Sequence, residues 1–543
     1  MLIVDFLETV IKNTLKKKGW DIQGEYLDFP SDRRFGDLTT NVAFRLSRQL
    51  RRSPSAVASE FIEALRSEPI FVKEIQRYIR DIKIEGAGFI NFYFTDDYFY
   101  LQLKQVISKG ADYFRPNLGC GKSVLIEFVS ANPTGPLSVA HARQAAVGDS
   151  LAEIMSYCGF KVAREYYLND EGNQIFILGK SVELRLKQLQ GERIDFPQDY
   201  YQGGYIYDIA KEILNQKERV IDFQEFAKDY ILTIIKKELD DFGVKFDNWY
   251  SQKELNRSGK IKLVLEELRQ KGFIYEKDGA LWFRSSALGD DKDRVVIKSD
   301  GSYTYLAPDI SYHQDKYKRN YKLLINLWGP DHHGYINRLK AAVRALGEED
   351  GSLVIVIVQL ATIFRDGKAI QMSTRKGQYI TLREVLDEVG RDASRFFFLM
   401  RKTSSHLDFD IEIAKKQSPE NPVYYIQYAY ARICSILRSS EIENLNCGVE
   451  ELSLLKEEEE MALIKKIFQF SPILSICVHT FDPYMLTVYL MELAEAFHRF
   501  YDRHRVLTEN TGLRQARLAL IAATRLTIGE GLRLLGVSRP EKM

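Results

Sequence analysis

A short segment near residue 130 carries residue types that could bind a phosphate group. The apolar run VLIEFV is typical of a buried strand, and the turn residues that follow it lead into an alanine-rich segment with the composition of a helix. The first N–H groups of a helix lack internal partners, and the helix dipole favours negative charge there. His141 falls in the first helical turn, where its ring can donate a hydrogen bond to a phosphate oxygen. The segment therefore predicts an anion-binding site.

Any strand–helix unit of a parallel sheet could show this pattern, so the spacing alone does not decide. The letters ANPTGPLSVAH resemble the nucleotide-binding signature of class I aminoacyl-tRNA synthetases, in the form ANPTGPLxxxH found in arginyl-tRNA synthetases. The resemblance implies ATP contacts from Pro133, Thr134, Gly135, Pro136, Ser138, Ala140 and His141. The usual HxGH of the family reads SVAH here, so its first histidine and its glycine are missing. The methyl group of Ala140 either fits beside adenine or crowds it.

A second donor-rich element is expected at the triphosphate. In this family a carboxylate attacks the α-phosphate of ATP and expels pyrophosphate, so the enzyme must hold two anions and stabilise charge on phosphate oxygens. The segment QMSTRKG, at 371–377, resembles the mobile KMSKS loop of class I synthetases, with Gln371 and Thr374 in place of its lysines. The resemblance implies an ATP contact for Met372 and catalytic roles for His141, Ser373, Arg375 and Lys376.

The substrate side should contain a carboxylate. A guanidinium is recognised by a carboxylate in a partly desolvated pocket with aromatic surface. The segment YLAPDISYH supplies Tyr305 and Asp309, which match the arginine-pocket positions of the family, although an Asp after a Pro is more often a turn or helix cap. The resemblance implies that Glu127 and Asn132 hold the polar end of the amino acid. Gln252 falls where many relatives carry a glutamate near the guanidinium.

The letters WGPDHHG could suggest a metal site formed by Asp331, His332 and His333. The resemblance instead places this loop at the ribose and adenine of ATP, so we expect Asp331 and His332 to contact ATP and no protein-bound metal. It implies ATP with Mg²⁺ as substrate and counterion, and no tightly bound cofactor. The segment EYYLNDEGNQI is a further match to the family, and its residues do not by themselves explain a role.

The residues 1–115 should form an N-terminal α+β domain. Apolar residues from Phe6 to Leu15 recur at helical spacing, and KIEGAGFINFYF alternates as a strand that ends near Phe94. GDLTTNVAF and GFINFYF resemble the additional N-terminal domain of arginyl-tRNA synthetases. The resemblance implies that Phe89 and Asn91 meet the elbow of the tRNA, where an aromatic face can stack on an unpaired base.

The rest of the chain divides into an α/β part and a helical part. Residues 116–410 alternate strand and helix patterns, which predicts a doubly wound parallel sheet of Rossmann type with a helical insertion at about 181–278. The run LVIVIVQLATIF is too short and too β-branched to span a membrane, so it predicts a central parallel strand. Residues 411–543 predict an all-α bundle and resemble the anticodon-binding domain of arginyl-tRNA synthetases.

The composition sets wider bounds. A chain of 543 residues is too long to fold around a single hydrophobic core. Its 76 Lys plus Arg nearly balance its 75 Asp plus Glu, so any RNA contact must come from local basic patches. Five scattered cysteines without a CxxC pair are typical of a reducing cytoplasm, and the amphipathic N-terminus lacks the basic region of a signal peptide.

Together with the resemblance, these patterns predict a cytoplasmic monomer that binds no membrane. They predict ATP-dependent ligation of L-arginine to tRNA(Arg) through an arginyl-adenylate. Two alternatives stay open. Another class I synthetase would share the ATP motifs, although the terminal domains argue against it. A synthetase-like protein that binds tRNA but has lost activation would explain the altered SVAH motif.

Overall fold

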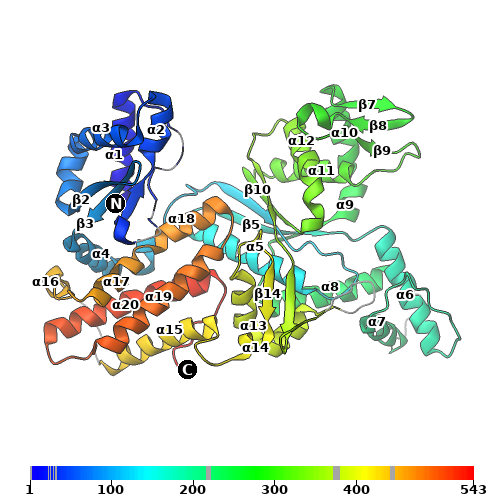
Figure 1. The fold of residues 1–543 in the computed structure, drawn as a ribbon. Helices are drawn as coiled ribbons and strands as arrows, with labels where there is room; N and C mark the ends of the chain where they lie inside the picture. The colour runs from blue at the N-terminus through cyan, green and yellow to red at the C-terminus, as the bar shows by residue number, and fades with distance from the viewer. Residues whose placement is uncertain are drawn as a thin grey trace. The chain divides into compact units, whose positions relative to one another are not determined.

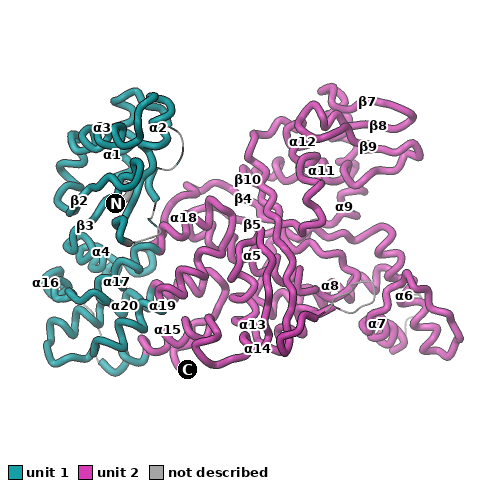
Figure 2. The backbone as a smooth tube through the Cα atoms, viewed as in Figure 1, with its two compact units in different colours: residues 1–113, 435–469, 495–526 teal, residues 114–434, 470–494, 527–543 magenta. Residues whose placement is uncertain are grey.

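The structure, a computed structural model, describes residues 3–22, 24, 26–28, 30, 33–215, 222–370, 379–440 and 447–543 (Figure 1). The chain forms two compact units, each assembled from segments that are far apart in the sequence (Figure 2). Unit 1 consists of residues 1–113, 435–469 and 495–526. Unit 2 consists of residues 114–434, 470–494 and 527–543.

The first part of unit 1 is an α+β domain. The apolar spacing predicts its first helix, and Leu7, Val10, Ile11 and Leu15 on that helix are buried. The antiparallel sheet has the strand order β1-β3-β2. The prediction of one strand across KIEGAGFINFYF is wrong, since Gly86 and Gly88 take positive φ and turn the chain into a hairpin. The elements are α1 (Ile3–Lys18), β1 (Leu38–Thr40), α2 (Val42–Leu50), α3 (Pro54–Arg66), β2 (Ile79–Glu85), β3 (Phe89–Phe94) and α4 (Asp96–Lys109).

After residue 415 the described chain consists of helices joined by turns and loops and contains no strand, as the 3.6-residue patterns predict. Its helices are α15 (Pro422–Ser439), α16 (Val449–Leu452), α17 (Glu458–Ile467), α18 (Phe470–Thr480), α19 (Tyr484–Arg503) and α20 (Thr511–Leu534). By length and composition alone, the described stretch Glu458–Thr480 is apolar enough to cross a membrane, and 44% of its most apolar window is buried. Core helices pass the same test, so the absence of membrane binding stays a prediction.

The nucleotide-binding sheet of unit 2 is parallel, with the strand order β11-β10-β4-β5-β6. Its strands are β4 (Ser123–Glu127), β5 (Lys161–Leu168), β6 (Asn248–Ser251), β10 (Leu323–Trp328) and β11 (Leu353–Ile357). The helices α5 (Val139–Tyr157), α11 (Leu306–Lys318) and α12 (Ile336–Leu346) connect them, which confirms the doubly wound α/β class. In such sheets ligands bind beyond the carboxyl ends of the strands where the strand order reverses, which here is between β4 and β10.

The predicted insertion also contributes a strand to this sheet. Besides its helices it contains β6, whose four half-buried residues NWYS give a weak strand pattern. The helices are α6 (Asn173–Leu189), α7 (Gly204–Asn215), α8 (Phe223–Asp241), α9 (Gln252–Arg257) and α10 (Lys260–Gln270). A separate antiparallel sheet of β7 (Ile274–Lys277), β8 (Ala280–Phe283) and β9 (Arg294–Ile297) follows.

The prediction of a central strand at LVIVIVQLATIF is wrong. The run divides into β11, an edge strand of the main sheet, and β12 (Ala361–Arg365), which pairs with β13 (Lys368–Ala369) and β14 (Leu407–Asp410). The physical reason is the fully buried Arg143, which donates to the carbonyl oxygens of Gln359 at 2.8 Å and Leu360 at 3.3 Å. In a continuous strand these carbonyl oxygens would accept hydrogen bonds from the N–H groups of a neighbouring strand. Here the guanidinium of Arg143, on α5, donates to them.

A second buried arginine holds the last residues of the chain in unit 2. Arg395 of α13 (Leu382–Leu399) is fully buried and pairs with Asp149 at 2.6 Å. It also donates to the carbonyl oxygens of Phe242 at 3.2 Å and Leu535 at 2.8 Å. Gly536 takes a φ of 68°, and a Cβ there would lie 2.4 Å from the guanidinium. The C-terminal segment is therefore part of the fold around α13, which α14 (Ile411–Lys415) follows.

Candidate active site

The chain leaves β4 through a strained turn. Val129 and Ser130 have φ values of 66° and 41°, and a positive φ at a β-branched residue costs on the order of 1–3 kcal/mol. The neighbouring strand β5 holds this turn in place. The Tyr167 N–H donates to Ser130 Oγ at 3.0 Å, and the Tyr166 hydroxyl donates to the carbonyl of Ala131 at 2.8 Å. The strain is thus located where the predicted phosphate-binding segment begins.

His141 lies in the first turn of α5, as the sequence predicts, and the structure defines its tautomer. The backbone N–H of Ser138 donates to His141 Nδ1 at 3.2 Å, so this nitrogen is an acceptor. In the neutral ring the proton is then on Nε2, where it can be donated to a phosphate oxygen. Burial lowers the pKa of His141 to about 4, so the ring is neutral near pH 7. His141 therefore offers an N–H donor without a positive charge.

The chain that follows the second motif lies against the first motif. The predicted site residues Met372, Ser373, Arg375 and Lys376 are outside the described residues. The next residues are described, and Thr381 forms an antiparallel bridge with Ser138. The Val139 N–H donates to the carbonyl of Ile380 at 3.2 Å, and the Tyr379 hydroxyl donates to that of Pro136 at 3.1 Å. The described residues just after the second motif are thereby fixed to the later half of the first motif.

The insertion covers the signature turn. Tyr205 of α7 donates its hydroxyl to the carbonyl of Thr134 at 2.8 Å. A Cβ at Gly135 would lie 3.0 Å from that hydroxyl oxygen and 3.1 Å from the one of Tyr379, so a larger residue would displace both phenols. Glu238 of α8 accepts the Leu137 N–H at 3.3 Å, and burial raises the pKa of this carboxyl to about 7. Helices far along the chain therefore fix the backbone that would cradle the phosphates.

Asp309 is a buried carboxyl group in the first turn of α11. Its Oδ2 accepts a hydrogen bond from the Tyr335 hydroxyl at 2.5 Å, and no side-chain cation of the described residues forms an ion pair with it. Burial raises the pKa of Asp309 to about 7, the Tyr335 hydrogen bond lowers it, and the nearby charge of Glu127 raises it. Because the helix N-cap is Tyr305 and no side chain caps the helix, the capping role considered for Asp309 is excluded. Asp309 is therefore a carboxyl group without an ion-pair partner among the described residues, although the nearby charge of Lys316 lowers its pKa.

Aromatic side chains surround this carboxyl group. The pKa of Tyr167 is raised by burial and by the charges of Asp309 and Glu127. Its ring lies 4.7 Å from that of Tyr312, and its hydroxyl donates to Gln252 Oε1 at 3.2 Å. Gln252 is therefore linked to the Asp309 pocket by one phenol, which agrees with its expected place.

The segment EYYLNDEGNQI positions Gln252 through the side chain of Asp170. Asp170 accepts hydrogen bonds from the Ser251 hydroxyl at 2.6 Å and from the Lys253 N–H at 2.9 Å. These two residues flank Gln252 at the start of α9, so Asp170 fixes that helix start to the end of β5.

Glu127 is at the carboxyl end of β4 and is already paired. The fully buried Lys316 donates to Glu127 Oε2 and, at 3.2 Å, to Asn326 Oδ1. The Ser130 hydroxyl donates to Glu127 Oε1 at 3.2 Å. Asn132, two residues further, donates to Gln174 Oε1 at 2.6 Å. The structure thus places Glu127 close enough to Asp309 for their charges to interact, with one Glu127 oxygen held only by a hydroxyl.

Comparisons with known proteins agree with this geometry. The chain matches the arginyl tRNA synthetase N terminal domain at 5–94, the catalytic domain of class I (R) tRNA synthetases at 102–406, and the DALR anticodon binding domain at 426–543. The arginine–tRNA ligase of Citrifermentans bemidjiense is 45% identical over 95% of this chain and 94% of its own length. The chain belongs to the arginyl-tRNA synthetase family.

Other arginyl-tRNA synthetases support the same assignment. The arginine–tRNA ligase of Bacillus subtilis is 43% identical and covers 99% of both chains. The structure of the arginyl-tRNA synthetase from Thermus thermophilus superimposes with a TM-score of 0.79 over 99% of both chains at 21% identity, which shows a shared fold.

Three positions expected for an arginyl-tRNA synthetase site, Tyr305, Asp331 and His332, are exposed in the structure. Tyr305 is 82% exposed. The phenol that bonds to Asp309 belongs to Tyr335, which directly follows the letters DHHG. Asp331 and His332 are exposed in the 3₁₀ turn Pro330–Tyr335, with Nε2 and Oδ2 3.4 Å apart. Among the residues that the structure describes, no group of three His, Cys, Asp or Glu side chains could hold a metal ion.

The two residues expected at the tRNA elbow differ in exposure. Phe89 is 45% exposed, and its ring centroid lies 4.8 Å from that of Phe44. Asn91 is 2% exposed, and its side-chain oxygen accepts a hydrogen bond from the Thr39 hydroxyl at 2.6 Å. Phe89 can therefore offer a ring to a base, whereas Asn91 is used inside the domain.

Proposed function

We propose that this chain ligates L-arginine to tRNA(Arg) with ATP, through an arginyl-adenylate. The buried carboxyl group of Asp309, which forms no ion pair with any described residue, carries this proposal, because a guanidinium supplies the missing charge and flat surface for the neighbouring aromatic rings. An amino acid with a neutral side chain would leave Asp309 without a partner, which disfavours other class I substrates. The Nε2 donor of His141 remains available despite the altered motif, which disfavours a protein that has lost activation.

In the proposed reaction the arginine carboxylate attacks the α-phosphorus of ATP, and pyrophosphate leaves with the electrons of the broken P–O bond. His141 donates its Nε2–H to a phosphate oxygen, and Ser373, Arg375 and Lys376 complete the charge stabilisation. The terminal ribose hydroxyl of tRNA then attacks the carbonyl carbon of the adenylate, and AMP leaves. ATP enters with Mg²⁺ as its counterion.

The polar groups of the substrates have separate places in this proposal. Glu127 accepts the α-ammonium group of arginine through its Oε1, and Asn132 bonds to the carboxylate end. The residues Met372, Asp331, His332 and 133–141 enclose ATP. Phe89 stacks on a base of the tRNA elbow, while Asn91 keeps the strand that carries it in register. We also propose a cytoplasmic monomer.

Charging of total tRNA with radiolabelled arginine tests this function. We expect acid-precipitable counts that require both the enzyme and ATP. A pyrophosphate-exchange screen over the other amino acids, with tRNA present, is the control. Charging with a different amino acid would identify another class I synthetase, and tRNA binding without any charging would identify the inactive relative.

Tyr335→Phe should weaken arginine binding. The change removes one hydroxyl that donates to Asp309, and a bond to a charged group is worth about 1.5 kcal/mol, so the KM for arginine should rise about tenfold. The KM for ATP should stay the same. Tyr303→Phe, at an exposed tyrosine just before α11, is the matched control. An arginine KM within about twofold of the parent would show that the Tyr335 hydroxyl does not support Asp309 (a change below ~0.5 kcal/mol).

A further inference from the structure

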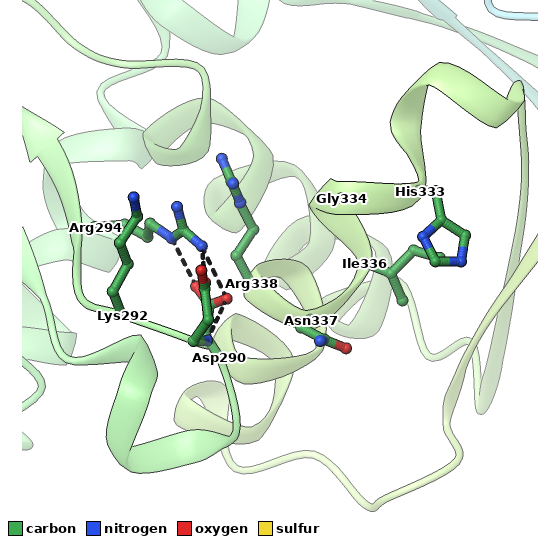
Figure 3. A pocket seen from close by; sticks show the side chains of 9 residues that line it. Asp290, Lys292, Arg294, His333, Gly334, Ile336, Asn337 and Arg338 are labelled. Atoms are coloured by element: carbon green, nitrogen blue, oxygen red, sulfur yellow. Dashed lines mark hydrogen bonds and ion pairs between the residues drawn. The ribbon is translucent and has the colours of Figure 1, made fainter.

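A second pocket lies on the segment that carries Tyr335 (Figure 3). It encloses about 570 Å³, a volume suited to a small ligand. One wall is the 290–294 segment that leads into β9, and the other is formed by residues 333–338 at the start of α12. Both walls belong to unit 2, and their lining residues differ from those that contact ATP or arginine in the proposed function, although Tyr335 lies between Gly334 and Ile336 in the second wall.

The charges of this pocket are unevenly paired. The Asp290 side chain is 2% exposed and binds Arg294 through both oxygens, at 2.8 and 3.0 Å. Asp291 pairs with the same guanidinium. Among the described residues, no anion pairs with Lys292 or Arg338. Two cations are therefore left for a ligand, while the acids are held by Arg294.

Arg338 connects the pocket to the amino-acid site. Its guanidinium lies 4.9 Å from the ring centroid of Tyr335, and its Nε is buried without a hydrogen-bond partner in the described chain. The hydroxyl of Tyr335 donates to Asp309. In Figure 3 the ends of Lys292 and Arg338 extend to the same side of the Asp290–Arg294 pair. One phenol thus lies between Asp309 and the guanidinium of Arg338.

We propose that Lys292 and Arg338 bind a backbone phosphate of the single-stranded 3′ end of tRNA. This inference rests on the proposed function, because the terminal ribose must reach the arginyl carbonyl and the strand must therefore pass close to the arginine pocket. A planar guanidinium fits two phosphate oxygens, and an ammonium adds a point charge. The ATP phosphates are expected at the opposite motif, the start of α5, so ATP does not compete for these cations.

Lys292→Glu tests the proposal, since Lys292 lines the pocket, is exposed and forms no ion pair with any described residue. We expect the KM for tRNA in the charging reaction to rise about tenfold, with the arginine and ATP KM values within twofold. Lys262→Glu, at an exposed lysine of α10, is the matched control and should leave all three values unchanged. A rise in the ATP KM would place the nucleotide in the pocket and overturn the proposal.

A truncated tRNA separates the 3′ strand from the rest of the molecule. The parent and Lys292→Glu should bind tRNA without its unpaired 3′ nucleotides with the same Kd, whereas intact tRNA should distinguish them about tenfold. An equal loss of affinity for both RNAs would place the contact elsewhere and overturn the proposal, as would no loss for either. A parent that charges no tRNA would instead refute the proposed function, which the charging assay reports separately.

Discussion

We expect His141→Ala to lower kcat by about 10²–10³, the typical loss of one transition-state donor, while the KM for arginine barely changes. The missing first histidine of the signature leaves His141 to make the phosphate contact alone. Steady-state charging kinetics at saturating arginine and ATP would measure the loss, with circular dichroism to confirm that α5 still forms.

The pH profile makes this prediction more specific. His141 is neutral above its pKa of about 4, so it should not titrate in activity between pH 6 and 8. If kcat instead fell as the pH rose through about 6.5, the usual pKa of a histidine, and this fall disappeared in His141→Ala, the His141 ring would act as a cation. Its tautomer would then be misassigned.

Ser138 and Ala140 are the controls for His141. Ser138→Ala should cost much less, because the Ser138 backbone N–H still bonds to Nδ1 and the helix N–H groups remain. Ala140→Gly should leave kcat unchanged or raise it, with any gain seen as tighter ATP binding. An indispensable Ser138 beside a dispensable His141 would mean that the triphosphate lies elsewhere. Activity that appears only on combining Ser138→His with Ala140→Gly would indicate the inactive, tRNA-binding relative.

Asp309→Asn should raise the KM for arginine by roughly 10- to 150-fold and that for ATP far less. The change keeps the shape but removes the charge opposite the guanidinium, and charge-assisted bonds of this kind are worth about 1.5–3 kcal/mol. Asp300→Asn, at an exposed aspartate in the turn before α11, is a matched control. An arginine KM within about twofold of the parent (below ~0.5 kcal/mol) would exclude Asp309 from the pocket.

The raised pKa of Asp309 gives this variant a second signature. The free carboxyl is protonated below about pH 7, so arginine must displace a proton there, and affinity should fall up to about tenfold per pH unit as the pH is lowered. In the unfolded chain the group ionises near pH 4, so it favours folding at low pH, and this contribution is lost as the pH rises from 4 to 7. The pH dependence of arginine KM should be absent in Asp309→Asn.

The sequence predicted the positions of those site residues whose place in a helix or turn follows from the residues next to them in the chain. His141 follows a strand and a turn, so local order was enough to place it at a helix start, and the same holds for Asp309 on α11. The sequence did not predict what surrounds Asp309. Tyr167 comes from β5 and Tyr335 from a turn after β10, and only the packing of the sheet brings these phenols to one carboxyl group.

Errors in the predicted strands have the same origin. The run from Leu353 to Phe364 is apolar except for Gln359 and Thr362, and one polar residue at Gln359 does not by itself end a strand. The break depends on Arg143, which lies more than two hundred residues earlier and was read only as part of an alanine-rich helix. Tyr305 matches a family position and is 82% exposed, so its role in arginine binding stays a prediction.

Arg395 has a consequence for the order in which the protein is made. Its acceptor at Leu535 follows it by 140 residues, so it is synthesised much later. Until Leu535 has emerged from the ribosome, this buried guanidinium lacks one of its partners, and an unsatisfied buried donor costs about 1–3 kcal/mol. The nucleotide-binding unit therefore reaches its native packing only after Leu535 is in place, so a chain that terminates before this residue is a polypeptide that proteases and chaperones can distinguish from the finished enzyme.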